Sequence, residues 1–111
     1  MRRLYRTITG IDAEPLAVEN AAKAGDAKAK EVVRIMADGL AAGFANVIHV
    51  LNPDIIVVGG SIAAVDILWK PAIAAVRGRI VYPELKSTPI VRATLGSDAN
   101  VLGAALITDA L

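Results

Sequence analysis

The sequence contains no cysteine and few aromatic residues: one tryptophan, one phenylalanine and two tyrosines among 111 residues. Without cysteine, the chain cannot form a disulfide framework or a thiolate metal site. Hydrophobic residues nevertheless make up 55% of the chain. The core must therefore be built mainly from alanine, valine, isoleucine and leucine, whose small side chains favour close packing of helices on strands.

An excess of charge of one sign is also missing. Twelve basic and eleven acidic residues give a formal net charge of +1, whereas a nucleic-acid binder normally carries a basic excess on one face. Arg2, Arg3 and Arg6 cluster near the start of the chain, and we interpret them as part of a solvated terminus. We therefore expect this segment to make no direct contact with nucleic acid.

Long hydrophobic runs are absent as well. No stretch reaches the ~20 apolar residues that a membrane-spanning helix needs. The N-terminal arginines precede the polar Thr7, Thr9 and Asp12, and not the apolar core of a signal peptide. The lack of cysteine fits a reducing compartment, so we expect one cytoplasmic domain with no membrane partner.

The common nucleotide-binding motifs are missing: the chain has no Gly-x-Gly-x-x-Gly and no glycine-rich loop ending in Gly-Lys-Ser/Thr. Instead, four apolar residues at 55–58 run directly into Gly59, Gly60 and Ser61. Such a run predicts a strand buried on both faces, as in parallel sheets covered by helices. Ligands in open α/β sheets bind at the carboxyl ends of strands, so this loop is a candidate site for phosphate or adenosine. A tight turn without a ligand is the alternative.

The remaining pattern predicts an α/β chain. We expect an irregular lead-in over residues 1–15, with a short extended piece from Leu4 to Ile8. Apolar spacing of three and four residues predicts a long helix over 27–51, with Asp26 as its N-cap. The other expected elements are helices over 16–24, about 63–76 and 99–110, and a second strand over 90–95. Pro71 implies either a helix that begins near residue 70 or a kink.

A strand–helix–strand order predicts two parallel strands joined by a right-handed crossover. Two strands make a poor sheet, because a stable one normally needs at least three. Either a partner chain supplies further strands, or this chain is part of something longer. Gly39 and Gly43 lie one turn apart in the long helix, which predicts a neighbour packed closely against them.

Four segments together suggest a family. They are Ala-Gly-Asp at 24–26, the helix end Gly-Phe-Ala-Asn to Asn-Pro-Asp at 43–54, Ile-Val-Val-Gly-Gly-Ser at 56–61 and Leu-Gly-Ser-Asp-Ala-Asn-Val-Leu-Gly-Ala-Ala at 95–105. In this order they resemble the C-terminal part of the ROK family, which contains bacterial sugar kinases and sugar-responsive repressors. The resemblance implies an actin-like (ribonuclease-H-like) architecture of two lobes, with ATP and sugar bound between them.

By this resemblance, Gly59, Gly60 and Ser61 approach the nucleotide, which is ATP with Mg²⁺. Asn46 would lie near the cleft, although a helix-surface amide is the alternative. Asp98 could be misread as catalytic, but its position predicts an N-cap of the last helix, a role that Ser97 could also take.

The sequence also departs from the kinases of the family. They carry an Asp-x-Gly-x-Thr phosphate loop, an Asn-Asp pair with the general base, and a zinc site of one histidine and three cysteines. None of these is present, and His49 lies in the middle of the long helix, where a structural role is expected. We therefore predict no catalytic and no metal-binding residue, and interpret residues 1–111 as a single C-terminal lobe fragment.

Three functions stay open at this point. The favoured one is the nucleotide-side lobe of an ATP-dependent hexose or N-acetylhexosamine kinase, because Gly59 and Gly60 keep the bare backbone that a nucleotide needs. The second is the effector-binding part of a sugar-responsive repressor. The third is an assembly module without a ligand, in which Gly39, Gly43 and the last helix serve dimerisation. We expect a missing N-terminal lobe and a homo-oligomer as partners.

Overall fold

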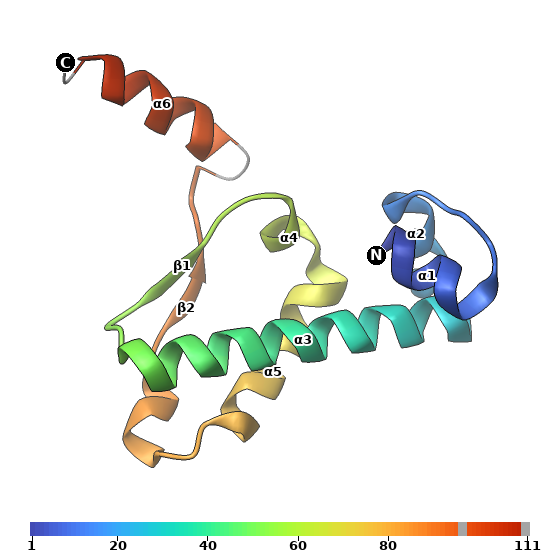
Figure 1. Ribbon diagram of the computed structural model, residues 1–111, viewed down its shortest axis with the longest axis horizontal. Helices are drawn as coiled ribbons and strands as arrows, with labels where there is room; N and C mark the ends of the chain where they lie inside the picture. The colour runs from blue at the N-terminus through green and yellow to red at the C-terminus, as the bar shows by residue number, and fades with distance from the viewer. Residues whose placement is uncertain (96–97, 110–111) are drawn as a thin grey trace.

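The computed structural model describes residues 1–95 and 98–109. A long helix, α3, runs across the molecule, with α1 and α2 at its N-terminal end and the two strands near its other end (Figure 1). The last helix, α6, extends away from this body (Figure 1). The elements are α1 (Arg2–Thr9), α2 (Pro15–Ala24), α3 (Ala27–Leu51), β1 (Ile56–Val58), α4 (Ser61–Ala64), α5 (Asp66–Arg79), the 3-10 helix η1 (Pro83–Ser87), β2 (Ile90–Arg92) and α6 (Ala99–Asp109).

The first residues form a helix, so the prediction of an irregular lead-in with an extended piece is wrong. Helix α1 ends at Gly10, whose φ of 77° is left-handed and whose N–H donates to the Arg6 carbonyl. The side chain of Arg2 pairs with Asp12 and Glu14, at 2.6 Å each. The hydrogen bond from Arg2 holds the pKa of the Asp12 carboxyl below its ordinary value. These contacts fold the segment after α1 back onto the helix.

Helices α2 and α3 confirm their predictions. Pro15 is the first residue of α2, where its missing N–H costs nothing. The Asp26 carboxylate caps α3 by accepting a hydrogen bond of 2.6 Å from the Ala29 N–H. The helix ends at Asn52, which takes a left-handed φ of 44° before Pro53.

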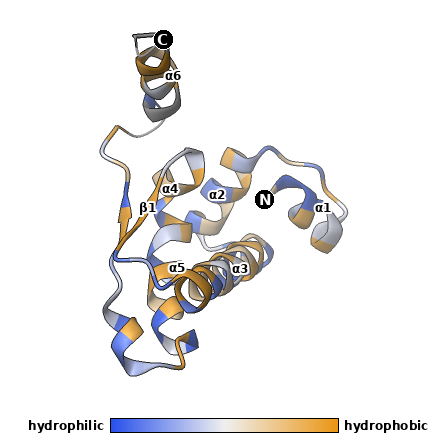
Figure 2. Cartoon of the chain, turned by 60° about the vertical axis from the view of Figure 1, so that its left-hand side comes forward, coloured by the Kyte–Doolittle hydropathy of each residue, from blue (hydrophilic) through white to orange (hydrophobic). Residues whose placement is uncertain are grey.

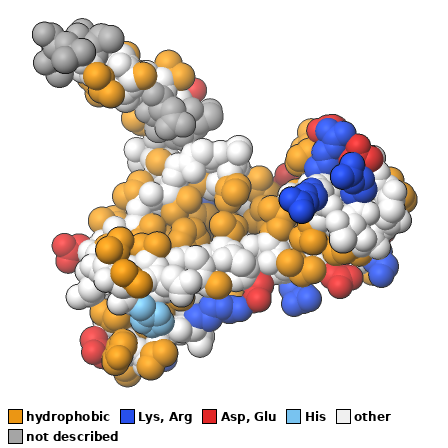
Figure 3. All heavy atoms as spheres, viewed as in Figure 1, with side chains coloured by type: hydrophobic (Ala, Val, Ile, Leu, Met, Phe, Trp, Pro, Cys, Tyr) orange, Lys and Arg blue, Asp and Glu red, His pale blue; other side chains and the backbone are white. Residues whose placement is uncertain are grey.

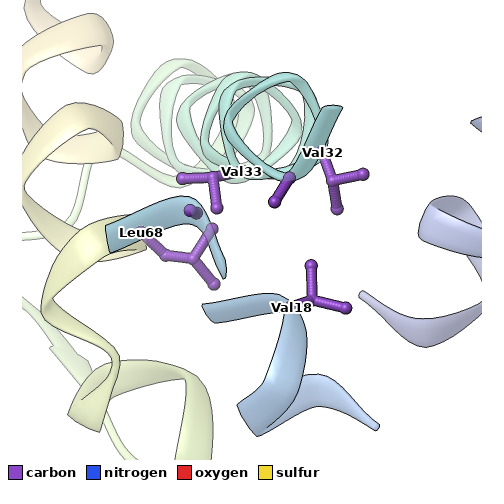
Figure 4. Packing of buried hydrophobic residues seen from close by; sticks show 6 residues of the cluster. Val18, Val32, Val33 and Leu68 are labelled. Carbon is purple, nitrogen blue, oxygen red and sulfur yellow. The ribbon is translucent and has the colours of Figure 1, made fainter. Parts of the chain in front are cut away.

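Two apolar clusters hold α3 in place. The first lies between α2, α3 and the start of α5, where the buried side chains of Val18, Val32 and Leu68 point toward one another (Figure 4). The second joins the C-terminal half of α3 to α5 and contains Ile48 and Val76, both fully buried. The strands lie on this second cluster, which therefore positions the loop after β1.

The close approach expected at Gly39 and Gly43 is not observed. A Cβ added at either glycine would meet no atom within 4 Å of the described structure. The small residues buried in the α3–α5 contact are alanines, including Ala41 and Ala72, both fully buried. Alanine packs two helices closely without the conformational cost of glycine.

The strands β1 and β2 pair in parallel, with Ile56 opposite Ile90 and Val58 opposite Arg92. The predicted parallel pairing is thus confirmed, although the second strand is shorter than expected. The prediction that the first strand is buried on both faces is wrong, because the side chain of Val57 is 59% exposed. Figure 2 shows apolar segments of β1 and α6 at the periphery of the molecule.

Helix α5 begins at Asp66 and contains Pro71 in its interior, so a start near residue 70 is wrong. Of the turn expected before the last helix, Gly96 and Ser97 lie outside the described residues. Helix α6 follows, and its described side chains are all exposed, with Val101 at 71% and Leu106 at 67%.

Helix α3 bears on the prediction that the chain contains no membrane span. The sequence predicts no span, yet α3 is long and apolar enough, by length and composition only, to cross a membrane. The core helix of a water-soluble domain satisfies the same criterion, and α3 packs against α2 and α5. This helix alone is therefore weak evidence for a membrane span.

The exposed apolar surface leads to a first prediction, that the chain is not a stable monomer. Apolar surfaces of β1 and α6 without a cover favour association with another surface. Light scattering at micromolar concentration should therefore give a mass above that of the monomer. A monomeric mass together with a cooperative thermal transition would contradict the prediction.

Candidate functional site

The loop that follows β1 is open to solvent. Gly59, Gly60 and Ser61 are all exposed; the two glycines connect β1 to α4, and Ser61 is the first residue of α4 (Figure 1). Gly60 has a φ of 81°, a conformation that residues with a side chain rarely adopt. A Cβ added at Gly60 would meet nothing within 4 Å, whereas one at Gly59 would contact the Cβ of Ala93 at 3.8 Å. A ligand can thus approach the backbone of this loop directly.

A cavity of about 180 Å³ adjoins the loop. Its walls come from the end of β1, the glycine loop, α4 and the end of β2. Most of the lining side chains are small and apolar; the polar ones belong to Ser61 and Arg92. The residues that line it are Val58, Gly59, Gly60, Ser61, Ala63, Ala64, Arg92 and Ala93. The structure thereby brings together all three predicted site residues at the carboxyl ends of both strands.

Arg92 lines the cavity, and the sequence interpretation did not single it out. Its Nη2 donates to the Asp66 carboxylate at 2.6 Å, and its guanidinium carbon lies 4.9 Å from the centre of the Trp69 ring. The Phe44 ring in turn meets the Trp69 ring edge-on at 6.5 Å between centroids. The sequence around an arginine in a strand does not predict contacts with Asp66 and Trp69 on α5, or through Trp69 with Phe44 on α3.

The ion pair favours the ionised form of Asp66. The hydrogen bond from Arg92, followed by its positive charge, lowers the pKa of the Asp66 carboxyl. A lowered pKa means that the pair contributes to stability above the ordinary carboxyl pKa of about 4, and that this contribution is lost as the pH falls further. At neutral pH, Asp66 is therefore a weak base whose charge is compensated by Arg92.

The other residues singled out in the sequence lie elsewhere. His49 Nε2 accepts a hydrogen bond of 3.1 Å from the Val81 N–H, and its ring meets Tyr82 edge-on at 6.2 Å. These contacts fit the structural role expected for His49. Asn46 is exposed on α3, is not among the residues that line the cavity, and fits the helix-surface interpretation. Basic side chains gather at the α1 end of the molecule, away from the glycine loop (Figure 3).

The described residues also bear on metal binding. Within 1–95 and 98–109, no three histidine, cysteine, aspartate or glutamate side chains are grouped so that they could hold a metal ion. The cavity offers one serine hydroxyl and one arginine, which is a poor donor set for a cation.

Two parallel strands joined through helices, with an open glycine loop and a cavity at their carboxyl ends, define an α/β chain with a candidate ligand site at this edge. The chain belongs to the ROK family, because the sequence model of that family matches residues 1–110. The predicted resemblance is thereby confirmed.

Among curated relatives, the chain is 36% identical over 89 residues to a glucokinase of Thermotoga maritima. It is 35% identical over 81 residues to an uncharacterised protein of Clostridium perfringens. These matches cover 79% and 72% of the chain but only 28% of each relative. The chain thus spans less than a third of the length of these relatives.

Solved structures show the same fold. A ROK hexokinase from Thermus thermophilus is similar with a TM-score of 0.79 and 27% identity, over 96% of this chain and 36% of that one. A ROK-family glucokinase from Streptomyces griseus, in complex with glucose and AMPPNP, gives a TM-score of 0.75 and 24% identity, over 95% of this chain and 35% of that one. The α/β fold of this chain is therefore similar to about a third of the length of ROK sugar kinases, which have the actin-like fold.

Proposed function

We propose that this chain is the C-terminal, nucleotide-side lobe of an ATP-dependent sugar kinase. The observation that carries the proposal is the exposed backbone of Gly59 and Gly60 beside the cavity. Bare glycines let a nucleotide approach the main chain, and their N–H groups are free of side-chain bulk. The ATP analogue AMPPNP and the glucose in the Streptomyces griseus glucokinase support ATP and a hexose as the substrates. The hexose would be glucose or an N-acetylhexosamine.

The remaining chemistry would come from a second lobe. Phosphoryl transfer requires a group that accepts the proton of the sugar hydroxyl, and Mg²⁺ to neutralise charge on the phosphates. The described residues offer one wall for the nucleotide and no grouped metal ligands. We therefore infer that an N-terminal lobe supplies the base and the metal site, and that the complete protein acts in the cytoplasm.

A sugar-responsive repressor is the competing function within the same family. The structural relatives named above are a hexokinase and a glucokinase, and the named curated relative is a glucokinase. The open glycine loop also favours a nucleotide site. The coding sequence just before residue 1 separates the two functions: an Asp-x-Gly-x-Thr motif indicates a kinase and a helix-turn-helix indicates a repressor.

The nucleotide site is tested by substituting Gly60 with valine. The left-handed backbone of Gly60 disfavours any side chain, and the valine would project into the space that the ligand needs. We expect ADP affinity, measured by calorimetry at millimolar ligand, to fall by about tenfold or more.

The matched control is Gly10→Val. Gly10 has a similar φ of 77°, with nothing within 4 Å of an added Cβ, but it lies at the end of α1 and not at the cavity. This variant also places a side chain on a backbone with positive φ, although the ψ of Gly10 is -5° and that of Gly60 is -178°, and it should bind ADP like the unmodified chain. Equal ADP binding by the unmodified chain and Gly60→Val would refute the site.

A further inference from the structure

The cavity next to the glycine loop contains one cation, and that cation is already paired. Arg92 lines the cavity from the end of β2. One edge of its guanidinium donates to the Asp66 carboxylate at 2.6 Å, and one face lies over the Trp69 ring at 4.9 Å. The side chain nevertheless remains 37% exposed. The face of the guanidinium away from Trp69 has no partner among the described contacts, and it offers a flat surface to a ligand.

We propose that Arg92 is the residue on which the base of the nucleotide stacks, with Trp69 and Asp66 holding its guanidinium plane in position. This inference depends on the nucleotide site proposed above and assigns the part of the nucleotide that enters the cavity. Arg92 would be a specificity-determining contact to the substrate.

The electrostatics of the cavity favour a base over a phosphate. Asp66 compensates the charge of Arg92, so the pair presents little net attraction to an anion. The other walls are glycine, alanine and valine with the single hydroxyl of Ser61. A flat aromatic base suits small apolar walls, and planar guanidinium groups stack well on aromatic faces.

Trp69 makes the test direct, because it is the only tryptophan in the chain. A base stacked on Arg92 would lie close to the Trp69 ring and alter its fluorescence. We expect adenosine and ADP to change the emission of Trp69 in the full 111-residue chain, and inorganic tripolyphosphate to leave it unchanged. A response to tripolyphosphate but not to adenosine would overturn the proposal without any variant.

Substitutions of Arg92 separate a stacking plane from a point charge. Arg92→Ala should lower the affinities for adenosine and for ADP by a similar factor of about ten, measured by calorimetry. Arg92→Lys should lower both affinities as much as Arg92→Ala does, because an ammonium group keeps the charge but has no flat surface on which a base can stack. Retained affinity in Arg92→Lys, or a loss that is confined to ADP, would instead indicate a phosphate contact and overturn the proposal.

Arg79→Ala is the matched control. Arg79 also pairs with an aspartate of another helix, Asp38 on α3, but it does not line the cavity. This variant should bind adenosine like the unmodified chain. If Gly60→Val loses ADP binding and Arg92→Ala keeps it, the base contact fails while the nucleotide site stands. If the unmodified chain binds neither adenosine nor ADP, both fail.

Discussion

Replacing Ile48 with alanine is expected to lower the free energy of unfolding by about 3 kcal/mol, within the range of about 2–5 for buried aliphatic residues. Ile48 is fully buried on α3 and belongs to the cluster with Val76 and Ile80 of the α5 side. The alanine would leave a cavity that the surrounding helices fill only in part. Urea denaturation followed by circular dichroism measures the loss.

Val50→Ala is the control, because Val50 lies on the same helix and is 79% exposed. Its effect should stay within about 0.5 kcal/mol. The strands also depend on this cluster, since Ile56 and Ile90 pack against it. Ile48→Ala should therefore weaken ADP binding as well. Equal destabilisation by the two variants would contradict the packing described for α3 and α5.

Local signals in the sequence were sufficient for the central helices. The cap at Asp26, the apolar spacing over 27–51 and the Asn52-Pro53 stop all act within a few residues. The prediction failed at α1, where Leu4 and Ile8 pack against the first core cluster. That tertiary contact, which local patterns do not encode, favours the helix over the extended conformation that β-branched residues prefer.

The candidate site was also predicted only in part, because only some of its features follow from local sequence patterns. A strand running into Gly59 and Gly60 is a local pattern, so the loop could be placed at the carboxyl end of β1. The pairing of Arg92 with Asp66 joins residues 26 positions apart through the crossover, and no periodicity predicts it. The exposure of Val57 was also missed. A four-residue apolar run shows that the strand prefers burial, but not that the burying surface lies within the same chain.

The 111-residue chain alone is expected to transfer no phosphoryl group from ATP to glucose. A general base works best when its pKa lies near the working pH. Asp66, the carboxylate paired with the cavity-lining Arg92, has its pKa lowered by that pair and holds a proton poorly at neutral pH. The described residues also contain no cluster of three or more histidine, cysteine, aspartate or glutamate side chains that could hold a metal ion. Sugar phosphate, followed by phosphorus NMR, should form no faster than in buffer.

The glucokinase of Thermotoga maritima, assayed under the same conditions, controls for the assay. Sugar phosphate formed by the chain would contradict the division between the two lobes. ADP binding without turnover, by contrast, would show that nucleotide binding and phosphoryl transfer, which enzymes usually combine, are separated between the two lobes. The open glycine loop of one lobe would bind the nucleotide. The groups that act on the transferred phosphate would lie on the other lobe. A kinase divided in this way can bring its reacting groups together only when the lobes close, because neither lobe holds a complete site.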